Sequence, residues 1–373
     1  MRLFHTGDLH IGKRPGNRSL ADDIREVMLG QVLGTAFEKY RPDGLIIAGD
    51  IYDRSAPSAE AVAVFDEIIS RAVELSLPLY IISGNHDSDR RISYGREIFL
   101  RGGVHISRPF TADSGIYTAQ CGGVDIALMP YVSKEQVKSC FPDESIETAT
   151  DAVRTVLAHS GLPRGGRPCV LAAHLAVGNF GADAVGTLDL VDPSVFEGFA
   201  YTALGHFHTP RNAAENVRYC GSPLCYSQSE AQRGAQKYLD IIDIAEDGAV
   251  SVEHFPLKPL HEVRLITDSL ENILSDKHPA SEDYVYVTIT ENDSFGSNAE
   301  RIGRKFPNYV SISYKLAGAQ AEGDIPTAES TELSFGELLS GFYKEMCGRE
   351  IGAELLKTAE DIFEECRRGE DTE

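Results

Sequence analysis

Short apolar runs alternate with longer amphipathic stretches along the first part of the chain. Three runs have the composition of buried strands, at Leu3–His5, Leu45–Ala48 and Leu79–Ile82. Between them, residues 20–39 and 58–76 carry apolar side chains at the spacing of a helix that packs on one face. This β-α-β-α-β order predicts a sheet with parallel strands joined by right-handed crossovers.

The alternation continues and predicts two further structural parts. We expect the second half of a two-sheet sandwich from five more strands, at Asp125–Met129, Cys169–Ala173, Tyr201–Leu204, Val217–Cys220 and Tyr238–Ile244. Beyond residue 260, the order strand, helix, strand, helix, strand predicts a small module. Its strands are expected at Glu262–Ile266, Tyr284–Thr290 and Val310–Tyr314, and its helices near 268–275 and at Asn298–Lys305.

The C-terminal part of the chain has a different pattern. Residues 317–331 are rich in small and polar residues, which predicts a linker. Two stretches with helical spacing and an apolar stripe follow, at about 334–347 and 350–367. We therefore divide the chain into residues 1–259, 260–316, 317–333 and 334–373.

The composition is that of a globular protein, with 42% apolar and 25% charged residues. No apolar run approaches the roughly 18 residues of a membrane span, so no membrane association is expected. Asp8 and His10 interrupt any secretory signal at the N-terminus, which predicts a cytoplasmic protein. The seven cysteines are scattered without a C-x-x-C, which argues against a disulfide framework or a zinc ribbon.

The formal net charge of -22 is unfavourable for binding nucleic acid, because phosphate backbones are usually met by excess Lys and Arg. Residues 322–373 account for much of it, with 15 Asp and Glu against 5 Lys and Arg. A bound metal pair would add positive charge where the substrate lies.

Metal-capable side chains follow the ends of the predicted strands. They occur in Gly7-Asp8-x-His10, Gly49-Asp50, Gly84-Asn85-His86, at His174, and in Gly205-His206-Phe207-His208. Open α/β sheets bind ligands outside the carboxyl ends of their strands, so these clusters are expected to converge. One histidine after a strand is most often structural, but five such clusters in series indicate a functional site.

The donor set indicates the kind of metal. Imidazole nitrogens mixed with carboxylates and an amide oxygen suit manganese, iron or zinc better than magnesium or calcium. No thiolate belongs to the set, which disfavours a structural zinc site. The number of ligands suits two ions, with one carboxylate bridging the ~3.5–4 Å gap used in two-metal hydrolysis.

The order and spelling of these clusters resemble the calcineurin-like metallophosphoesterases. The resemblance implies an α/β (α+β) fold, a four-layer β-sandwich flanked by helices, here followed by a small α/β capping domain and a C-terminal helical pair. It implies that His86 is a catalytic proton donor that binds no metal. It also implies two divalent ions, the first held by Asp8, His10, Asp50 and His208, the second by Asp50, Asn85, His174 and His206.

The spelling further resembles the DNA break-repair nucleases of this superfamily, in M-R-L-F-H-T-G-D-L-H, I-I-A-G-D-I-Y-D-R, I-S-G-N-H-D-S and V-R-Y-C-G-S-P-L. This implies a Mn²⁺-dependent exonuclease and endonuclease that cuts DNA ends and hairpins in repair and recombination. The implied partners are DNA, an SMC-like ATPase on the C-terminal helices, and a second copy in a homodimer. Arg54, Lys13 and Arg90 are the candidates for holding DNA phosphates, on loops next to the metal ligands.

Other interpretations stay open. A phosphatase or cyclic-nucleotide phosphodiesterase could use the same metal core, although the first motif continues with Ile11-Gly12 and the third ends in Asp87, unlike protein phosphatases of the superfamily. A scaffold without activity is disfavoured because all the core residues are present. The C-terminal helices could pack on their own domain, and the candidate cations could be ordinary solvated charges.

Overall fold

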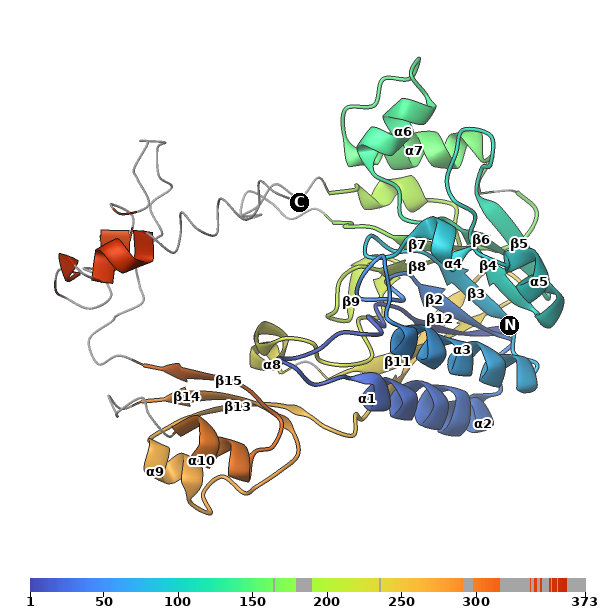
Figure 1. The fold of residues 1–373 in the computed structure, drawn as a ribbon. Coiled ribbons are helices and arrows are strands. Elements are labelled where there is room, and N and C mark those ends of the chain that lie inside the picture. Colours follow the sequence, from blue (N-terminus) through green and yellow to red (C-terminus); the bar gives the residue numbers. More distant parts are fainter. Residues whose placement is uncertain are drawn as a thin grey trace. The chain divides into compact units, whose positions relative to one another are not determined.

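The computed structural model describes residues 1–163, 165–178, 190–234, 236–290 and 298–315, and in the C-terminal part 336, 339–340, 343, 349, 351–353 and 355–360. Two six-stranded sheets pack face to face, and helices cover their outer faces (Figure 1). The expected α/β fold, a four-layer sandwich of helices, sheet, sheet and helices, is confirmed.

The first sheet has the strand order β12-β11-β1-β2-β3-β4. Strands β1 to β4 run parallel, and β11 pairs antiparallel with β1. The bounds are β1 (Arg2–Thr6), β2 (Gly44–Ala48), β3 (Leu79–Ile82), β4 (Val104–Ile106), β11 (Tyr238–Ile244) and β12 (Val250–Pro256). The prediction that Tyr238–Ile244 belongs to the second sheet was wrong, because a strand's own residues do not specify which sheet it joins.

The helices on the first sheet follow the apolar spacing. A continuous helical segment is formed by α1 (Ala21–Arg25), a π-helical stretch η1 (Glu26–Ala36) and α2 (Phe37–Tyr40). Helix α3 (Ala59–Glu74) begins at Ser58, whose side chain accepts a hydrogen bond from the Ala61 amide. Both predicted helices are present, but the π winding was not predicted, because apolar spacing does not separate it from an α-helix.

The second sheet has the order β5-β6-β7-β8-β10-β9. Its central strands β6, β7, β8 and β10 are parallel, and its outer face carries α6 (Lys134–Cys140) and α7 (Ala149–His159). The four other strands predicted for this sheet are present, and the sequence analysis missed β5, β9 and both helices. The bounds are β5 (Tyr117–Cys121), β6 (Val124–Leu128), β7 (Cys169–His174), β8 (Tyr201–Gly205), β9 (Arg211–Ala214) and β10 (Val217–Tyr219).

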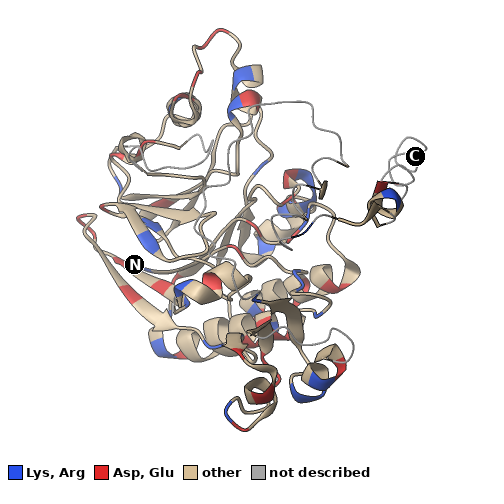
Figure 2. Ribbon diagram, turned by 90° about the vertical axis from the view of Figure 1, so that its left-hand side faces the viewer, with Lys and Arg blue, Asp and Glu red and all other residues tan. Residues whose placement is uncertain are grey.

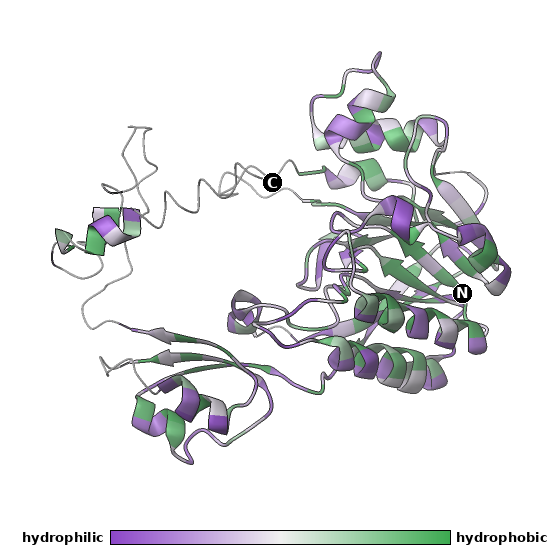
Figure 3. Ribbon diagram, in the orientation of Figure 1, coloured by the Kyte–Doolittle hydropathy of each residue, from purple (hydrophilic) through white to green (hydrophobic). Residues whose placement is uncertain are grey.

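Three buried apolar clusters separate the four layers. One lies between the first sheet and its helices, one between the sheets, and one beneath α6 and α7. The strands are accordingly apolar along most of their length, whereas the helices carry an apolar and a polar face (Figure 3). The carboxyl ends of the two sheets meet, since His174 at the end of β7 hydrogen-bonds the Ala48 carbonyl at the end of β2.

The small module is a separate three-stranded sheet, ordered β13-β14-β15, with two helices. Its elements match the prediction closely: β13 (Val263–Asp268), α9 (Leu270–Leu274), β14 (Tyr284–Ile289), α10 (Asn298–Lys305) and β15 (Tyr309–Tyr314). Buried Asp23 on α1 accepts hydrogen bonds from the Tyr284 hydroxyl (2.9 Å) and the His261 ring (3.1 Å). The module is thus anchored to the helical layer of the first sheet.

Much of the C-terminal part lies outside the described residues, including the predicted linker 317–333 and most of the helix pair. The described residues 339–340 and 355–360 are helical. Among the described helices, none has the length and apolar content needed to cross a membrane. Figure 2 shows Asp and Glu on helices, strands and loops alike, with Lys and Arg between them.

Candidate active site

The carboxyl ends of five strands place the predicted ligands at one edge of the sandwich. Four of these residues adopt left-handed backbone conformations, with φ of 52° at Asp8, 43° at His10, 48° at Asp50 and 101° at His206. Such conformations cost of order 1–3 kcal/mol each in residues other than glycine and concentrate at functional sites. The strain turns these side chains away from the strand direction and into the site.

The glycines that precede the motifs allow the strand ends to approach closely. A Cβ on Gly84 would overlap the Asp50 carboxylate, and one on Gly205 would overlap the Ala48 carbonyl and crowd the His174 ring. These motifs therefore begin with glycine because a neighbouring ligand or strand end occupies the space of a side chain. The sequence showed these glycines but not what they make room for.

Asp8, His10 and His208 form one group of possible ligands. Their donor atoms lie within 4.8 Å of one another. The Nε2 atoms of His10 and His208 are 3.0 Å apart. One Asp8 oxygen accepts a hydrogen bond from the His206 amide, while the other, Oδ2, is buried without a partner.

Asp50, Asn85, His174 and His206 form the adjoining group. Asn85 Oδ1 lies 3.1 Å from both His174 Nε2 and His206 Nδ1. Asp50 lies between the groups, since its Oδ2 is 3.5 Å from His10 Nε2 and 3.4 Å from His174 Nε2. The structure thus brings all seven predicted ligands together, with Asp50 in the position expected of a bridging carboxylate.

The electrostatics of this cluster fit divalent cations. Burial lowers the pKa of His10 to about 3 and that of His206 to about 4, so these rings stay neutral and keep a lone pair for a metal. Burial opposes ionisation of Asp50, but His174 outweighs it and holds the Asp50 pKa well below its usual range. An unpaired oxygen on buried Asp8 is costly unless a cation faces it. The donor set is the one a transition metal prefers.

His86 lies beside the ligands and is exposed. Its amide donates to Asp50 Oδ1 (2.9 Å), and its ring Nδ1 lies 3.0 Å from the Asp53 carbonyl oxygen. Its ring contacts the His10 ring edge-on at 4.8 Å between centroids. His86 could therefore reach both the ligand cluster and a substrate bound over it.

The three candidate phosphate-binding cations differ in their surroundings. Lys13 Nζ already pairs with Asp53 Oδ1 at 2.8 Å, whereas the Arg54 side chain is 85% exposed. Arg90 and Arg91 are exposed, but the prediction that they lie on a loop was wrong. They lie in the short helix α4 (Asp89–Ile92), which ends at Ser93, and a single turn leaves no apolar periodicity in the sequence.

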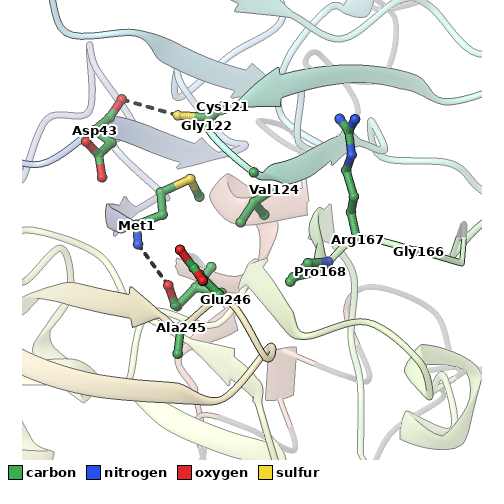
Figure 4. Close-up of a pocket in the computed structure, with 12 residues that line it drawn as sticks. Met1, Asp43, Cys121, Gly122, Val124, Gly166, Arg167, Pro168, Ala245 and Glu246 are labelled. Atoms are coloured by element: carbon green, nitrogen blue, oxygen red, sulfur yellow. Dashed lines mark hydrogen bonds between the residues drawn. The ribbon is translucent and has the colours of Figure 1, made fainter.

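Two hollows flank the ligand cluster. One, of about 550 Å³, is lined by Lys13, Arg14, Arg54 and Ser58, among others. The other, of about 390 Å³, lies against His206 and His208 and also includes Lys13. A cavity of about 610 Å³ lies at the other end of the sheets (Figure 4). Within the described residues, the three groups able to hold a metal all belong to the ligand cluster.

Three supporting residues were missed by the sequence analysis. The Asp87 carboxylate accepts hydrogen bonds from the amides of Ile51, Tyr52 and Gly84, and so joins two ligand loops. The Tyr226 hydroxyl donates to the carbonyls of Asp8 and Leu9. Glu230 accepts from the His208 ring. Asp87 directly follows a motif and could have been found, whereas the other two become neighbours of the site only through folding.

Comparison with known proteins agrees with this geometry. The model of the calcineurin-like phosphoesterase family matches residues 1–210. A protein of Staphylococcus epidermidis, the SbcD component of the nuclease SbcCD, is 30% identical over 325 residues, which cover 84% of this chain and 85% of that protein. The chain therefore belongs to the calcineurin-like phosphoesterase family and is a metal-dependent phosphoesterase.

Proposed function

We propose that this phosphoesterase is a Mn²⁺-dependent DNA nuclease, with exonuclease and endonuclease activity on DNA ends and hairpins in repair and recombination. The observation that carries the proposal is the extent of the similarity to a component of a nuclease. The similarity covers 325 residues, whereas the family model covers only residues 1–210. It therefore includes much of the chain beyond the core that all phosphoesterases of the family share.

In the proposed site, two divalent ions are held by the two ligand groups. Asp8, His10 and His208 hold the first, Asn85, His174 and His206 hold the second, and Asp50 is shared. The ions would supply Lewis acidity at the phosphate and activate the attacking water. The surrounding protein fixes the ligands, since His174 Nδ1 is held by the Ala48 carbonyl at 2.8 Å, which leaves Nε2 facing Asn85 and Asp50.

His86 is the proposed proton donor to the leaving oxygen. A donor hydrogen bond from Nδ1 to the Asp53 carbonyl fixes the ring and leaves Nε2 to carry the transferred proton. The exposure of His86 supports this role, because the donor must reach the substrate. The predicted ligands Asp8 and Asp50, by contrast, are buried.

The DNA strand is proposed to lie along the two hollows that flank the ligands. Arg54 is the best candidate for a phosphate contact, because it is exposed and lies on the larger hollow. Lys13 borders both hollows, and its pairing with Asp53 would have to loosen for it to bind phosphate fully. Arg90 on α4 is a third, outer contact.

The partners follow from the same similarity. The relative's name describes one component of a complex, SbcCD. We propose that residues 334–373 dock on an SMC-like ATPase of the SbcC type after the linker 317–333. We further propose that residues 260–316 cap the nuclease domain 1–259, and that the protein forms homodimers in the cytoplasm.

A phosphatase or small-molecule phosphodiesterase is the second candidate. The net charge of -22 favours it, because like charge repels a polyanion such as DNA. The exposed Arg54 beside the ligands could hold the single phosphate of such a substrate equally well.

The test is cleavage of labelled single-stranded and hairpin DNA by the full chain with Mn²⁺, Mg²⁺ or EDTA, next to an aryl phosphodiester. Asp8→Asn is the inactive control, and Asp43→Asn, at the far end of the sheets, is the matched silent one. Manganese-dependent cutting that Asp8→Asn abolishes is expected. Intact DNA with rapid hydrolysis of the aryl ester would replace the nuclease by the second candidate.

A further inference from the structure

Glu230 lies on α8 (Gln228–Arg233), a short helix outside the two sheets. In the sequence, Ser227-Gln228-Ser229-Glu230 has the spelling of a capping box, in which the Glu side chain turns back to the backbone of the first residue. Ser227 does accept a hydrogen bond from the Glu230 amide. The Glu230 carboxylate, however, points elsewhere and has a different use.

One oxygen of this carboxylate, Oε1, lies 2.9 Å from His208 Nδ1. The opposite ring nitrogen of His208, Nε2, faces His10 in the ligand cluster at 3.0 Å. A histidine that donates Nδ1–H to a carboxylate is held in the tautomer with a free lone pair on Nε2. Glu230 therefore fixes both the ring orientation and the ligating nitrogen of His208.

Lys237 holds the other oxygen of Glu230 and is itself buried, with 6% of its surface exposed. Its ammonium donates to Glu230 Oε2, to the His208 carbonyl and to Ser222 Oγ, each at 2.9 Å. An ammonium has three N–H donors, and here all three are used. Lys237 thus joins the backbone of His208 to the carboxylate that holds its ring.

We propose that Glu230, anchored by Lys237, is a positioning residue that sets the affinity of the first metal site through His208. A buried Lys–Glu pair is costly to desolvate and adds little to stability over apolar residues of equal size. Its placement against both ends of one predicted ligand is what a supporting shell for a metal requires. The inference rests on the proposed role of His208 as a ligand, and not on DNA as substrate.

The test is calorimetric titration of the metal-free full chain with Mn²⁺. Glu230→Leu combined with Lys237→Met removes both buried charges together and retains bulk at each position. Loss of an outer hydrogen bond to a ligating histidine typically weakens metal binding by roughly 10- to 100-fold, so we expect that loss at one of the two Mn²⁺ sites. Glu230→Gln, which keeps an acceptor for His208, is expected to fall between this variant and the wild type.

Asp268 provides the matched control. Its carboxylate also binds a histidine and a lysine, His278 at 3.0 Å and Lys277 at 2.7 Å, but in the small module. Asp268→Asn is expected to leave both Mn²⁺ affinities unchanged. Thermal unfolding of every metal-free variant checks the fold, and Glu230→Gln carries the test if the double variant does not fold.

Two results would overturn the inference. Folded Glu230 variants that bind both ions with wild-type affinity would show that His208 needs no support. Equal weakening of both sites would show a general structural role instead. Titration of His208→Ala separates the underlying assignment: if it weakens one site and the Glu230 variants do not, only this inference falls, and if it weakens neither, the ligand assignment itself falls.

Discussion

The two ends of the paired sheets differ in a way that cavity size does not reveal. At the amino ends of β1, β2 and β7 lies a cavity of about 610 Å³, bordered by Asp43, Cys121, Arg167 and Glu246 (Figure 4). At the carboxyl ends, smaller hollows flank a cluster of buried ligands. The larger space has no group of metal-capable residues among those described, and the chemistry lies beside the smaller ones.

The contrast lies in what the polar groups do. At the amino ends they are satisfied locally: the Asp43 carboxylate accepts the Arg2 amide, and the Cys121 thiol donates to the Asp43 carbonyl. At the carboxyl ends, Asp8 and Asp50 are buried, strained in backbone, and within reach of several imidazoles. Buried charge and strain persist only where something else stabilises them, and for a phosphoesterase that is the metal.

The largest expected effect is that of Asp50→Asn. Because Asp50 lies between both ligand groups, its loss should weaken both metals and reduce hydrolysis of an aryl phosphodiester by roughly 10³-fold or more. Elemental analysis beside kinetics measures the two effects. Asp43→Asn, the counterpart at the amino ends, should leave metal content and rate unchanged, and retention of both metals in Asp50→Asn would refute the shared position.

His86→Ala should separate metal binding from catalysis. Removing a proton donor typically costs roughly 10²- to 10⁴-fold in rate. Metal content should stay at the wild-type level, because His86 is not a predicted ligand. Loss of metal in this variant would contradict the role given to His86 and would move it into the first ligand group, beside His10 and Asp50. Exposed His159→Ala is the control.

Acid should destabilise the middle of the sandwich through His5 on β1. Burial, reinforced by Arg218, lowers the pKa of His5 from 6.5 to about 4, although Asp240 opposes the shift. The unfolded chain therefore takes up the proton first, and the stability present above pH 6.5 is lost as the pH falls toward 4. The loss is about 3 kcal/mol. Urea unfolding in EDTA at about pH 7 and about pH 4 measures it.

His5→Gln is the matched variant for this measurement. Its stability should depend less on pH than that of the wild type by the same amount, because His10 and His206, which also lie in the site edge of the sandwich, titrate equally in both proteins. An identical pH dependence in the two proteins would show that His5 is not the group that resists protonation.

The smallest expected effect compares one glycine from each end of the sheets. Gly84→Ala places a methyl group against the Asp50 carboxylate and should cost roughly 1–3 kcal/mol of unfolding free energy, with loss of metal. Gly123→Ala, at the amino-end cavity, meets open space and should change neither. Chemical unfolding and metal analysis test both, and equal costs would show that the carboxyl ends are no more crowded than the amino ends.

Most of the fold could be predicted where a segment's own pattern decides its structure. The first three strands, the helix at 58–76 and the small module agree with the structure within a few residues, because local periodicity reflects one buried face. The short edge strands β5 and β9 could not be found, since few residues in them are buried. The sheet of β11 was assigned wrongly because pairing between distant strands leaves no local signal.

The sequence by itself determined the kind of site: carboxylates, imidazoles and an amide placed after successive strands, in an order that resembles one family. That was possible because parallel strands end at one edge, so order along the chain becomes proximity in space. Only the tertiary structure decided which residues support the ligands. Glu230 and Lys237 follow His208 by 22 and 29 residues, and no spacing in the sequence connects them to it. They meet His208 because the chain from α8 to the start of β11 folds back against it, and such contacts depend on the packing of whole elements, which local periodicity does not encode.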